Sequence, residues 1–567
     1  EGARTHEDAE SYYKSYQEAL AELARQNYDR QDNDPGKNAL RRAGISVKLS
    51  ALYPRYEPRN AQDCVPVLVE RMKLLCRKAA DCGLNLTMDA EEVNRLEVSL
   101  EIVEQLCQDP DLSQWDGLGL AVQAYQKRCL PLIDHLGDMA RQYNRRLQVR
   151  LVKGAYWDTE IKYAQMEGFE DFPVFTKKNN TDLSFLACAQ KLLDQRDLFY
   201  PMLATHNAQS VLSCLELAED NGSGWEFQRL HGMGEALYDI LKERVDVPVS
   251  IYAPVGTHKD LLPYLVRRLL ENGANSSFVN QIADPDIDLQ ELLLDPVQDA
   301  RDRDIHRHRH IRLPLDLYPD RKNSKGKDLD DFKSCSELNE TIEQRVFSRH
   351  LDFNEILGHK AADPGQKPGQ MTISSNPADL SDVVGDVPST TTRDIQSAFE
   401  KCEAAFPIWN RKPVDKRAEI LEQIADLYED QMDLLIGLII REAGRHPHDA
   451  IMEVREAVDF CRYYAARARE LFEKSSLPGP TGETNEYTVE GRGVFVCISP
   501  WNFPLAIFTG QIAAAMVCGN TVVAKPAEQT PIVAAYGVYL MRRAGVPKNV
   551  LQLLPGDGKT GQSIIEN

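Results

Sequence analysis

The sequence predicts an α/β protein that consists of a parallel barrel followed by a second, shorter α/β unit. Three observations support this prediction. Short apolar segments alternate with helical stretches through the first half of the chain, most of these segments run into a polar or charged residue, and a separate strand and helix pattern begins near residue 490. Alternating strands and helices are typical of a parallel sheet.

Seven strand candidates lie in the first half, at residues 44–47, 84–88, 119–122, 147–149, 200–204, 226–230 and 250–251. The residues that end or follow them carry functional groups: Lys48, Asp89, Gln123, Arg150, Lys153, Thr205, His206, His231 and Tyr252. Polar groups at the carboxyl ends of parallel strands are typical of a (β/α)8 barrel with its active site on that face. A barrel closes with eight strands, so one strand is unaccounted for.

The amino terminus suggests where that strand belongs. The chain begins at Glu1 without an initiator Met, and residues 11–20 form an amphipathic helix pattern preceded by a capping box of Thr5 and Asp8. A helix therefore comes first where a barrel would place a strand. We expect a fragment that begins after the first barrel strand and stops at Asn567, shortly after a strand-like segment at 549–554.

Composition narrows the class of protein. A length of 567 residues allows two or more domains, and a net charge of −21 argues against nucleic-acid binding in this segment. The 12 cysteines form no C-x-x-C pair, which suits a reducing cytoplasm. The longest apolar stretch, residues 503–519, is too short for a confident membrane span, so we expect any membrane contact to be peripheral.

The chain changes character after about residue 280. Residues 284–336 are dense in charge and include the alternating segment His306 to His310. Its arginines would repel a cation and no acidic or thiolate ligand completes a set, so we expect no metal site. We predict a barrel over residues 1–280, a helical connector over 281–369 and a further domain over 370–567.

Two adjacent arginines, Arg267 and Arg268, stand within an apolar helix pattern at residues 264–271. Adjacent helix positions point about 100° apart, so at least one guanidinium is expected to face inward, where it needs an anionic partner. A carboxylate or a phosphate would serve. The alternative is that both reach solvent or that Arg268 pairs with Glu271 at i,i+3 spacing.

Several segments together carry a family resemblance: residues 45–52, 88–92, 123–128, 150–157, 204–207, 230–234 and 252–271. In this order they resemble the proline dehydrogenase domain of the proline utilization A family of bacterial bifunctional flavoenzymes. The resemblance implies a distorted barrel that binds FAD, oxidises L-proline to 1-pyrroline-5-carboxylate and passes the electrons to a membrane quinone.

The resemblance also implies a substrate site. Proline presents a carboxylate, a secondary amine and an apolar ring, so its site needs cations and an apolar wall beside the flavin. The residues implied in binding are Lys48, Tyr156, Leu230, Tyr252, Tyr264, Arg267, Arg268 and the gating carboxylate Glu1. Asp89 is expected to hold Tyr252, although an aspartate at a strand end could instead cap a helix.

The implied FAD site lies across the carboxyl ends of the middle strands. Arg150 is expected near the redox-active edge of the flavin, where a positive charge favours the reduced ring. The implied FAD contacts are Asp89, Gln123, Arg150, Val152, Lys153, Gly154, Ala155, Trp157, Thr205, His206, Arg268 and Glu271. His206 could instead be an ordinary core histidine. Lys48, Asp89, Arg150 and Tyr252 are the residues expected to support the chemistry.

Residues 494–504, 521–528 and 554–556 resemble the NAD-binding half of aldehyde dehydrogenases. The resemblance implies that Asn502 stabilises an oxyanion and that Ile498, Trp501, Asn502, Lys525 and Glu528 contribute to the NAD site. The general base and nucleophilic cysteine of that family lie beyond the segment present. Cys497 and Cys518 precede the position of the nucleophile, so we expect neither to replace it and the chain itself not to reduce NAD.

We therefore expect an FAD-dependent proline dehydrogenase whose parent protein also oxidises L-glutamate γ-semialdehyde with NAD. Its expected partners are L-proline and a quinone reached by peripheral membrane contact, and the parent is expected to be a homo-oligomer in the cytoplasm, with no nucleic acid bound to this segment. The alternatives are another flavin barrel, such as a folate reductase type, and a noncatalytic regulatory or scaffold protein.

Overall fold

The computed structural model describes residues 2–29, 43–219, 224–256, 261–262, 264–266, 295–303, 306–358 and 371–567. The chain divides into two compact units. Unit 1 comprises residues 1–164 and 172–311, and unit 2 comprises residues 165–171 and 312–567. Within the described ranges, no helix combines the length and the apolar character needed to span a membrane.

Unit 1 contains one parallel sheet of seven strands, and the strands lie in the same order in the sheet as in the sequence. Their bounds are β1 Gly44–Val47, β2 Asn85–Met88, β3 Leu118–Gln123, β4 Leu147–Val152, β5 Phe199–Ala204, β6 Glu226–Leu230 and β7 Val249–Tyr252. The predicted strands and the predicted parallel α/β fold are therefore confirmed. Adjacent, parallel strands bring their carboxyl ends to one edge of the sheet.

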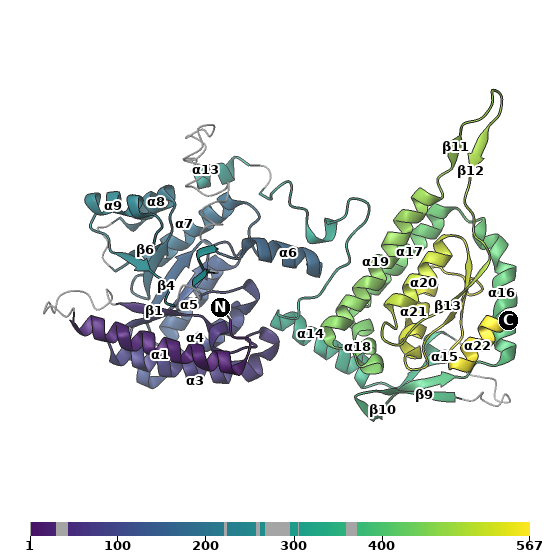
Figure 1. The fold of residues 1–567 in the computed structure, drawn as a ribbon, viewed down its shortest axis with the longest axis horizontal. Helices are drawn as coiled ribbons and strands as arrows, with labels where there is room; N and C mark the ends of the chain where they lie inside the picture. Colours follow the sequence, from purple (N-terminus) through teal and green to yellow (C-terminus); the bar gives the residue numbers. More distant parts are fainter. Residues whose placement is uncertain are drawn as a thin grey trace. The chain divides into compact units, whose positions relative to one another are not determined.

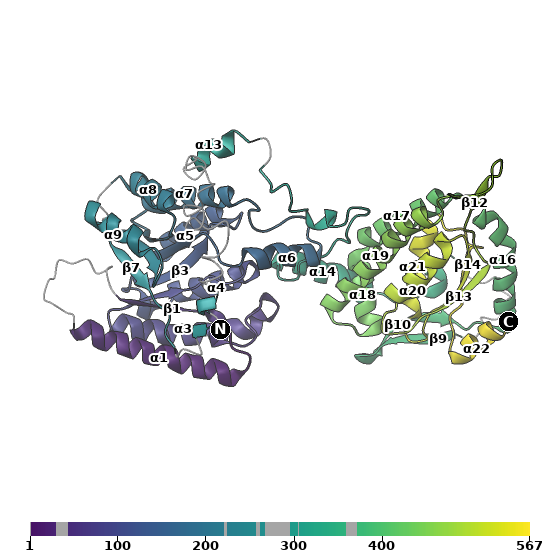
Figure 2. The same ribbon diagram turned by 45° about the horizontal axis from the view of Figure 1, so that its top comes forward.

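Helices connect these strands and lie on the outside of the curved sheet (Figures 1 and 2). The helices of unit 1 are α1 His6–Asp29, α2 Leu49–Leu52, α3 Ala61–Asp81, α4 Leu96–Cys107, α5 Cys129–Gln142, α6 Trp157–Glu167, α7 Lys178–Asp194, α8 Ala208–Ala218, α9 Glu235–Arg244 and α13 Pro296–Arg301, with 3-10 turns η1 Pro58–Asn60, η2 Val93–Arg95 and η3 Pro110–Leu112. The last three residues of α6 belong to unit 2. Because helices cover the sheet, strands such as β3 are buried along their whole length.

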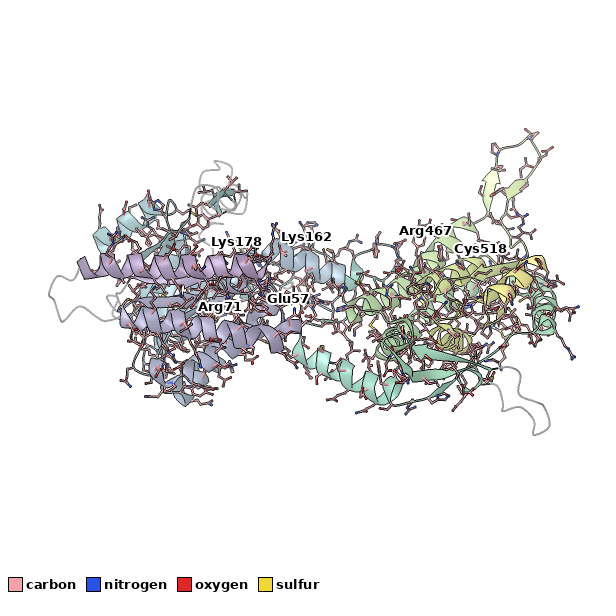
Figure 3. The ribbon with its side chains drawn as sticks, turned by 60° about the horizontal axis from the view of Figure 1, so that its bottom comes forward. Glu57, Arg71, Lys162, Lys178, Arg467 and Cys518 are labelled. Carbon is pink, nitrogen blue, oxygen red and sulfur yellow. The ribbon has the colours of Figure 1, made fainter. Side chains whose placement is uncertain are left out.

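The amino-terminal helix α1 begins with the predicted capping box. The Asp8 amide donates to Thr5 Oγ1, and the Thr5 amide donates to an Asp8 carboxylate oxygen, each at 3.1 Å. Arg71 of α3, labelled in Figure 3, donates to Glu10 of α1 at 3.0 Å. The Arg71 guanidinium also lies 5.3 Å from the centre of the Tyr13 ring. These contacts fix α1 against α3, beside the amino-terminal strand β1.

Unit 2 combines three sheets with a helical layer. The sheets have the strand orders β8-β10-β9, β11-β12 and β13-β14-β15, and the last of these is parallel. The strands are β8 Leu351–Asp352, β9 Met371–Asn376, β10 Asp379–Pro388, β11 Ser475–Leu477, β12 Asn485–Tyr487, β13 Val494–Ile498, β14 Thr521–Lys525 and β15 Leu551–Leu553. Figure 1 shows the β11-β12 hairpin extending away from the rest of this unit.

The helices of unit 2 are α14 Phe332–Ile342, α15 Phe353–Ile356, α16 Thr392–Asn410, α17 Val414–Asp430, α18 Met432–Ala443, α19 Pro447–Leu471, α20 Ala506–Val517, α21 Pro531–Arg543 and α22 Gly558–Glu566, with the 3-10 turn η4 Pro314–Asp316 and the π-helical turn η5 Glu343–Phe347. Leu338, Ile342 and Val346 are buried in the same core as α18 and α21. The carboxyl-terminal part of the predicted connector thus contributes to the core of unit 2.

Close contact between two strands explains a glycine in the middle of β3. A Cβ atom added at Gly119 would lie 2.7 Å from the Gln148 carbonyl oxygen and 2.8 Å from Gln148 Cβ on β4. Both distances are shorter than van der Waals contact, so any side chain at this position must push the two strands apart.

We predict that Gly119→Ala destabilises unit 1 by about 1–3 kcal/mol, the range for overpacking in a well-packed core. Gly137→Ala is the matched control, because an added Cβ on α5 would make ordinary contacts at 3.4–3.6 Å. Alanine in a helix is favoured over glycine by about 0.5–1 kcal/mol, so this control should be neutral or stabilising. Urea unfolding measures both, and equal effects would contradict the prediction.

Candidate active site

Arg150 lies at the centre of a polar network inside the sheet of unit 1. Its Nε donates to Gln228 Oε1 at 2.7 Å, its Nη1 to Asp89 Oδ1 at 2.7 Å and its Nη2 to Ser46 Oγ at 2.6 Å. These partners come from β6, from the end of β2 and from β1. Three strands therefore fix the plane of one buried guanidinium.

Asp89 lies between two cations. Besides Arg150, its carboxylate pairs with Lys48 Nζ, 3.8 Å from Oδ2, and Lys48 Nζ in turn lies 3.5 Å from the Tyr156 hydroxyl. Burial alone would lower the pKa of Lys48, but the Asp89 carboxylate and the neighbouring Tyr156 outweigh it, so the pKa of Lys48 is raised above its ordinary value. Lys48 is thus held as a cation at the carboxyl end of β1.

Tyr252 packs on the same arginine. The centre of its ring lies 5.2 Å from the Arg150 guanidinium carbon. The negative charge of Asp89, followed by burial, raises the pKa of the Tyr252 hydroxyl well above its usual value, so the phenol remains neutral. Glu92, not Asp89, occupies the N-cap of the following turn η2. Asp89 therefore serves as a counter-ion here, and the helix-cap alternative is wrong.

Four residues of this network were not among the predicted site residues. Ser46 and Gln228 bond directly to Arg150, Glu226 bonds to Gln228, and the hydroxyl of Tyr16 on α1 accepts a bond from the Lys48 amide at 3.1 Å. Burial is the main cause that raises the pKa of Tyr16, to about 12. The alternation of polar residues at positions 226 and 228 within a buried strand is the sequence signal that points to two of them.

The segment after β4 packs closely against Tyr125. Gly154 adopts a φ of +134°, and an added Cβ would lie 2.4 Å from the Tyr125 ring, so only glycine fits. Lys153 bonds to the Asp182 carboxylate and to Ser210 Oγ. Trp157, at the start of α6, donates its indole N–H to the Phe175 carbonyl at 2.8 Å. Val152 and Ala155, the other predicted residues here, lie in the same segment.

The neighbouring strand ends complete this edge of the sheet. His206 Nε2 accepts a bond from the Leu230 amide at 3.0 Å, which connects the end of β5 to the end of β6. The Thr205 carbonyl accepts a bond from the buried Tyr238 hydroxyl at 2.7 Å. Gln123, at the end of β3, donates to the Glu91 carbonyl at 3.1 Å. His206 thus has a backbone partner, and its ring orientation is fixed.

Of the remaining residues predicted in unit 1, Glu1, Arg267, Arg268 and Glu271 lie outside the described residues. Tyr264 is described and is partly buried. The structure therefore brings together the strand-end residues of the predicted site, whereas the arginine pair and the gating carboxylate remain predictions from the sequence.

Unit 2 holds the second group of predicted residues. Asn502 follows β13, and its backbone carbonyl accepts a bond from Arg445 Nη1 at 2.5 Å. The same guanidinium lies 4.6 Å from the centre of the Phe503 ring. The buried Glu453 of α19 accepts a bond from the Leu505 amide at 2.8 Å, and burial raises its pKa to about 7. Two charged side chains, neither predicted, therefore hold the loop that carries Asn502.

The other predicted residues of unit 2 lie at the ends of its parallel strands. Lys525 ends β14; its Nζ bonds to the Pro526 carbonyl at 3.0 Å and lies 3.9 Å from a Glu528 carboxylate oxygen. Ile498 and Trp501 are exposed beside it along β13 and the following loop. Cys497 is buried, and burial raises the pKa of its thiol to about 12, which makes it a poor nucleophile.

Burial likewise raises the pKa of Cys518, which is labelled in Figure 3. The nearby Arg417 acts in the opposite direction, but burial outweighs it, so the Cys518 thiol is also a poor nucleophile. That neither residue takes the covalent role stays a prediction from the sequence.

Comparison with known proteins identifies both units. Residues 1–281 match the proline dehydrogenase family, and residues 365–567 match the aldehyde dehydrogenase family. The first unit is thus a proline dehydrogenase domain, and the second contains an aldehyde dehydrogenase domain. The resemblances to these two families are therefore confirmed.

The chain is 46% identical over 574 residues to the bifunctional protein PutA of Salmonella typhimurium (strain LT2), covering 99% of this chain and 42% of that protein. It is 36% identical over 196 residues to 1-pyrroline-5-carboxylate dehydrogenase of Bacillus subtilis (strain 168), covering 34% of this chain and 38% of the relative. A crystal structure of bifunctional proline utilization A (PutA) protein has a TM-score of 0.89 and 45% identity, covering 100% of this chain and 54% of that one.

The chain therefore belongs to the proline utilization A family, in which a proline dehydrogenase domain is joined to an aldehyde dehydrogenase domain. It spans less than half the length of the PutA relative from Salmonella typhimurium.

We predict a coupling free energy of about 1–3 kcal/mol between Asp89 and Arg150, because each removal leaves a partly buried charge without its partner. A double-mutant cycle of Asp89→Asn and Arg150→Met, followed by urea unfolding, measures it. The surface pair Glu22 and Arg25, cycled in the same way, is the control and should show no measurable coupling. Additive effects at Asp89 and Arg150 would contradict the interpretation.

Proposed function

We propose that unit 1 catalyses the FAD-dependent oxidation of L-proline to 1-pyrroline-5-carboxylate. The observation that carries this proposal is the network of Arg150, Asp89, Lys48 and Tyr252 at the carboxyl ends of four strands. It combines fixed cations with an aromatic surface in one place. A small amino acid with a carboxylate and an apolar ring needs both.

In this proposal Lys48, together with Arg267 and Arg268, binds the substrate carboxylate. Lys48 is suited to the role because Asp89 keeps it charged and Tyr156 lies beside its ammonium group. Tyr252, Tyr156, Leu230 and Tyr264 form the wall against the proline ring, and Glu1 closes the site over bound substrate. These contacts would orient the substrate and exclude water from it.

The residues of unit 1 also fit a flavin. Arg150 supplies a fixed positive charge on β4, and the backbone after this strand turns at Gly154, whose φ of +134° favours glycine. FAD, when bound, accepts the hydride from the substrate. Gln123, Val152, Lys153, Ala155, Trp157, Thr205, His206, Arg268 and Glu271 would hold it, and Arg150 would stabilise negative charge on the reduced ring.

The proposal extends to the electron acceptor, the oligomeric state and the second activity of the parent protein. We propose that electrons pass to a quinone through peripheral contact with the cytoplasmic face of a membrane, and that the parent is a homo-oligomer. Residues 370–567 would form part of a domain that oxidises L-glutamate γ-semialdehyde, with Asn502 as the oxyanion donor and Ile498, Trp501, Lys525 and Glu528 at the NAD site. Residues 1–280 and 281–369 would be the barrel and the connector.

The test of the main proposal is spectroscopic. Anaerobic addition of L-proline to the flavin-loaded protein should bleach the flavin absorbance, because the reduced ring no longer absorbs in the visible range. A folate substrate should leave the spectrum unchanged. Bleaching by a reduced folate alone would assign the barrel to another flavin enzyme, and no bound flavin at all would favour a noncatalytic role.

We predict that Arg267→Met or Arg268→Met raises the KM for proline roughly tenfold or more, because each charge-assisted hydrogen bond contributes about 1.5 to 3 kcal/mol. Steady-state kinetics with an artificial electron acceptor measures the effect. Both residues lie outside the described part of the chain, so this prediction comes from the sequence. An unchanged KM in both variants would remove these arginines from the substrate site.

We further predict that tetrahydrofuran-2-carboxylate competes with proline. It presents the same carboxylate and a ring of similar size, but its ring oxygen replaces the amine that oxidation requires. Competitive inhibition and a perturbed flavin spectrum are the expected results. Tetrahydrofuran, which lacks the carboxylate, is the matched control and should bind at least tenfold more weakly; equal inhibition by both would argue against cationic recognition.

A further inference from the structure

A second buried carboxylate, Glu226, is connected to Arg150 through Gln228, and the proposed function assigns it no role. Glu226 is the first residue of β6, and only 6% of its surface is exposed. Its Oε1 accepts a bond from Gln228 Nε2 at 2.7 Å, and its Oε2 accepts bonds from the Ser250 hydroxyl at 2.9 Å and the Tyr200 hydroxyl at 3.5 Å. A buried carboxylate is costly unless its bonds are satisfied, and these are.

Gln228 connects this carboxylate to Arg150. Its amide oxygen accepts the Arg150 Nε–H at 2.7 Å, and its amide nitrogen donates to Glu226 and contacts the Met202 sulfur at 3.0 Å. An arginine can only donate and an ionised carboxylate can only accept, so the amide has one orientation that satisfies both neighbours. The chain of bonds from Glu226 through Gln228 to Arg150 therefore runs in one direction.

Burial raises the pKa of Glu226, whereas its hydrogen bonds to Gln228 and Ser250 and the charge of Arg150 favour its ionised form. In that form, carboxylates lie on two sides of the Arg150 guanidinium. Asp89 contacts Nη1 directly, whereas Glu226 acts one residue away through the polarised amide. Ser46 takes Nη2, so each nitrogen of the Arg150 guanidinium has a partner, and rotation about its last side-chain bonds would break bonds to three strands. Bonds in such a buried chain polarise one another and strengthen the whole.

We propose that Gln228 and Glu226 are positioning residues of the proline dehydrogenase site, which fix the Arg150 guanidinium and offset part of its charge toward the flavin. The inference rests on the proposed function for the identity of the cofactor. Gln228 fixes the orientation of the Arg150 guanidinium through its hydrogen bond to Nε. Glu226 offsets part of the positive charge that the guanidinium presents.

The test uses the flavin-loaded protein and three variants. Glu226→Gln keeps the shape and removes the charge, so the flavin midpoint potential should shift to a more positive value, because a negative charge near the cation is lost. Gln228→Leu removes the link, so kcat should fall roughly tenfold with KM for proline changed less than about twofold, since one hydrogen bond to a charged group is worth about 1.5 kcal/mol.

Gln148→Leu is the matched control. Gln148 lies two residues before Arg150 on the same strand and is also buried, but its amide donates to the Asp116 carbonyl at 3.3 Å, at the other end of the sheet. It undergoes the same chemical change in the same interior. The flavin midpoint potential, the kcat and the KM for proline of Gln148→Leu should match those of the unchanged protein, even if its free energy of unfolding falls.

The outcomes separate this inference from the proposed function. The midpoint potential is measured with a dye and without proline, so the effect of Glu226→Gln can be judged even if proline is not the substrate. An unchanged potential in Glu226→Gln, or an equal shift in Gln148→Leu, would overturn the inference. If Gln228→Leu does not fold, the isosteric Glu226→Gln decides the question alone.

Discussion

The arrangement of unit 1 depends on the burial of one permanent positive charge. An arginine inside a sheet is tolerated only when its donors are satisfied and its charge is compensated. Arg150 meets this condition with Gln228, Asp89 and Ser46, which come from three other elements. The strands must therefore adopt one register to satisfy it, and the same register places Lys48 and Tyr252 beside it. Stability and the geometry of the site have a common cause.

A similar solution occurs in unit 2 with the signs reversed. One oxygen of the buried Glu453 carboxylate accepts backbone amides at the start of α20, and the other lies 3.7 Å from Arg445 Nε. Arg445 also bonds to the Asn502 carbonyl and covers Phe503. A loop that must present an amide side chain is thus held by Glu453 on α19 and by Arg445 in the loop before that helix. Both units place a functional side chain at the end of a parallel strand and fix it with a buried ion from a neighbouring element.

The seven strands and their parallel order could be predicted from the sequence, because short strand-like segments alternate with helical patterns through the first half of the chain. The strand-end residues Lys48, Asp89 and Arg150 could be predicted for the same reason. Ser46 and Tyr16 could not, since a serine in a strand and a tyrosine on an amphipathic helix look like ordinary residues. Their roles follow from contacts across 104 and 32 residues of sequence.

The sequence by itself determined which chemistry is available: a proline dehydrogenase barrel, an aldehyde dehydrogenase segment and the charged residues at their strand ends. Local sequence patterns indicate the helices, strands and turns, because the spacing of apolar residues and the residue types in turns depend only on neighbouring positions in the chain. The tertiary structure alone decided the partners of each charge. It made Asp89 a counter-ion rather than a helix cap, and it placed Glu226 behind Gln228. Such pairings depend on register and burial, which no local pattern specifies.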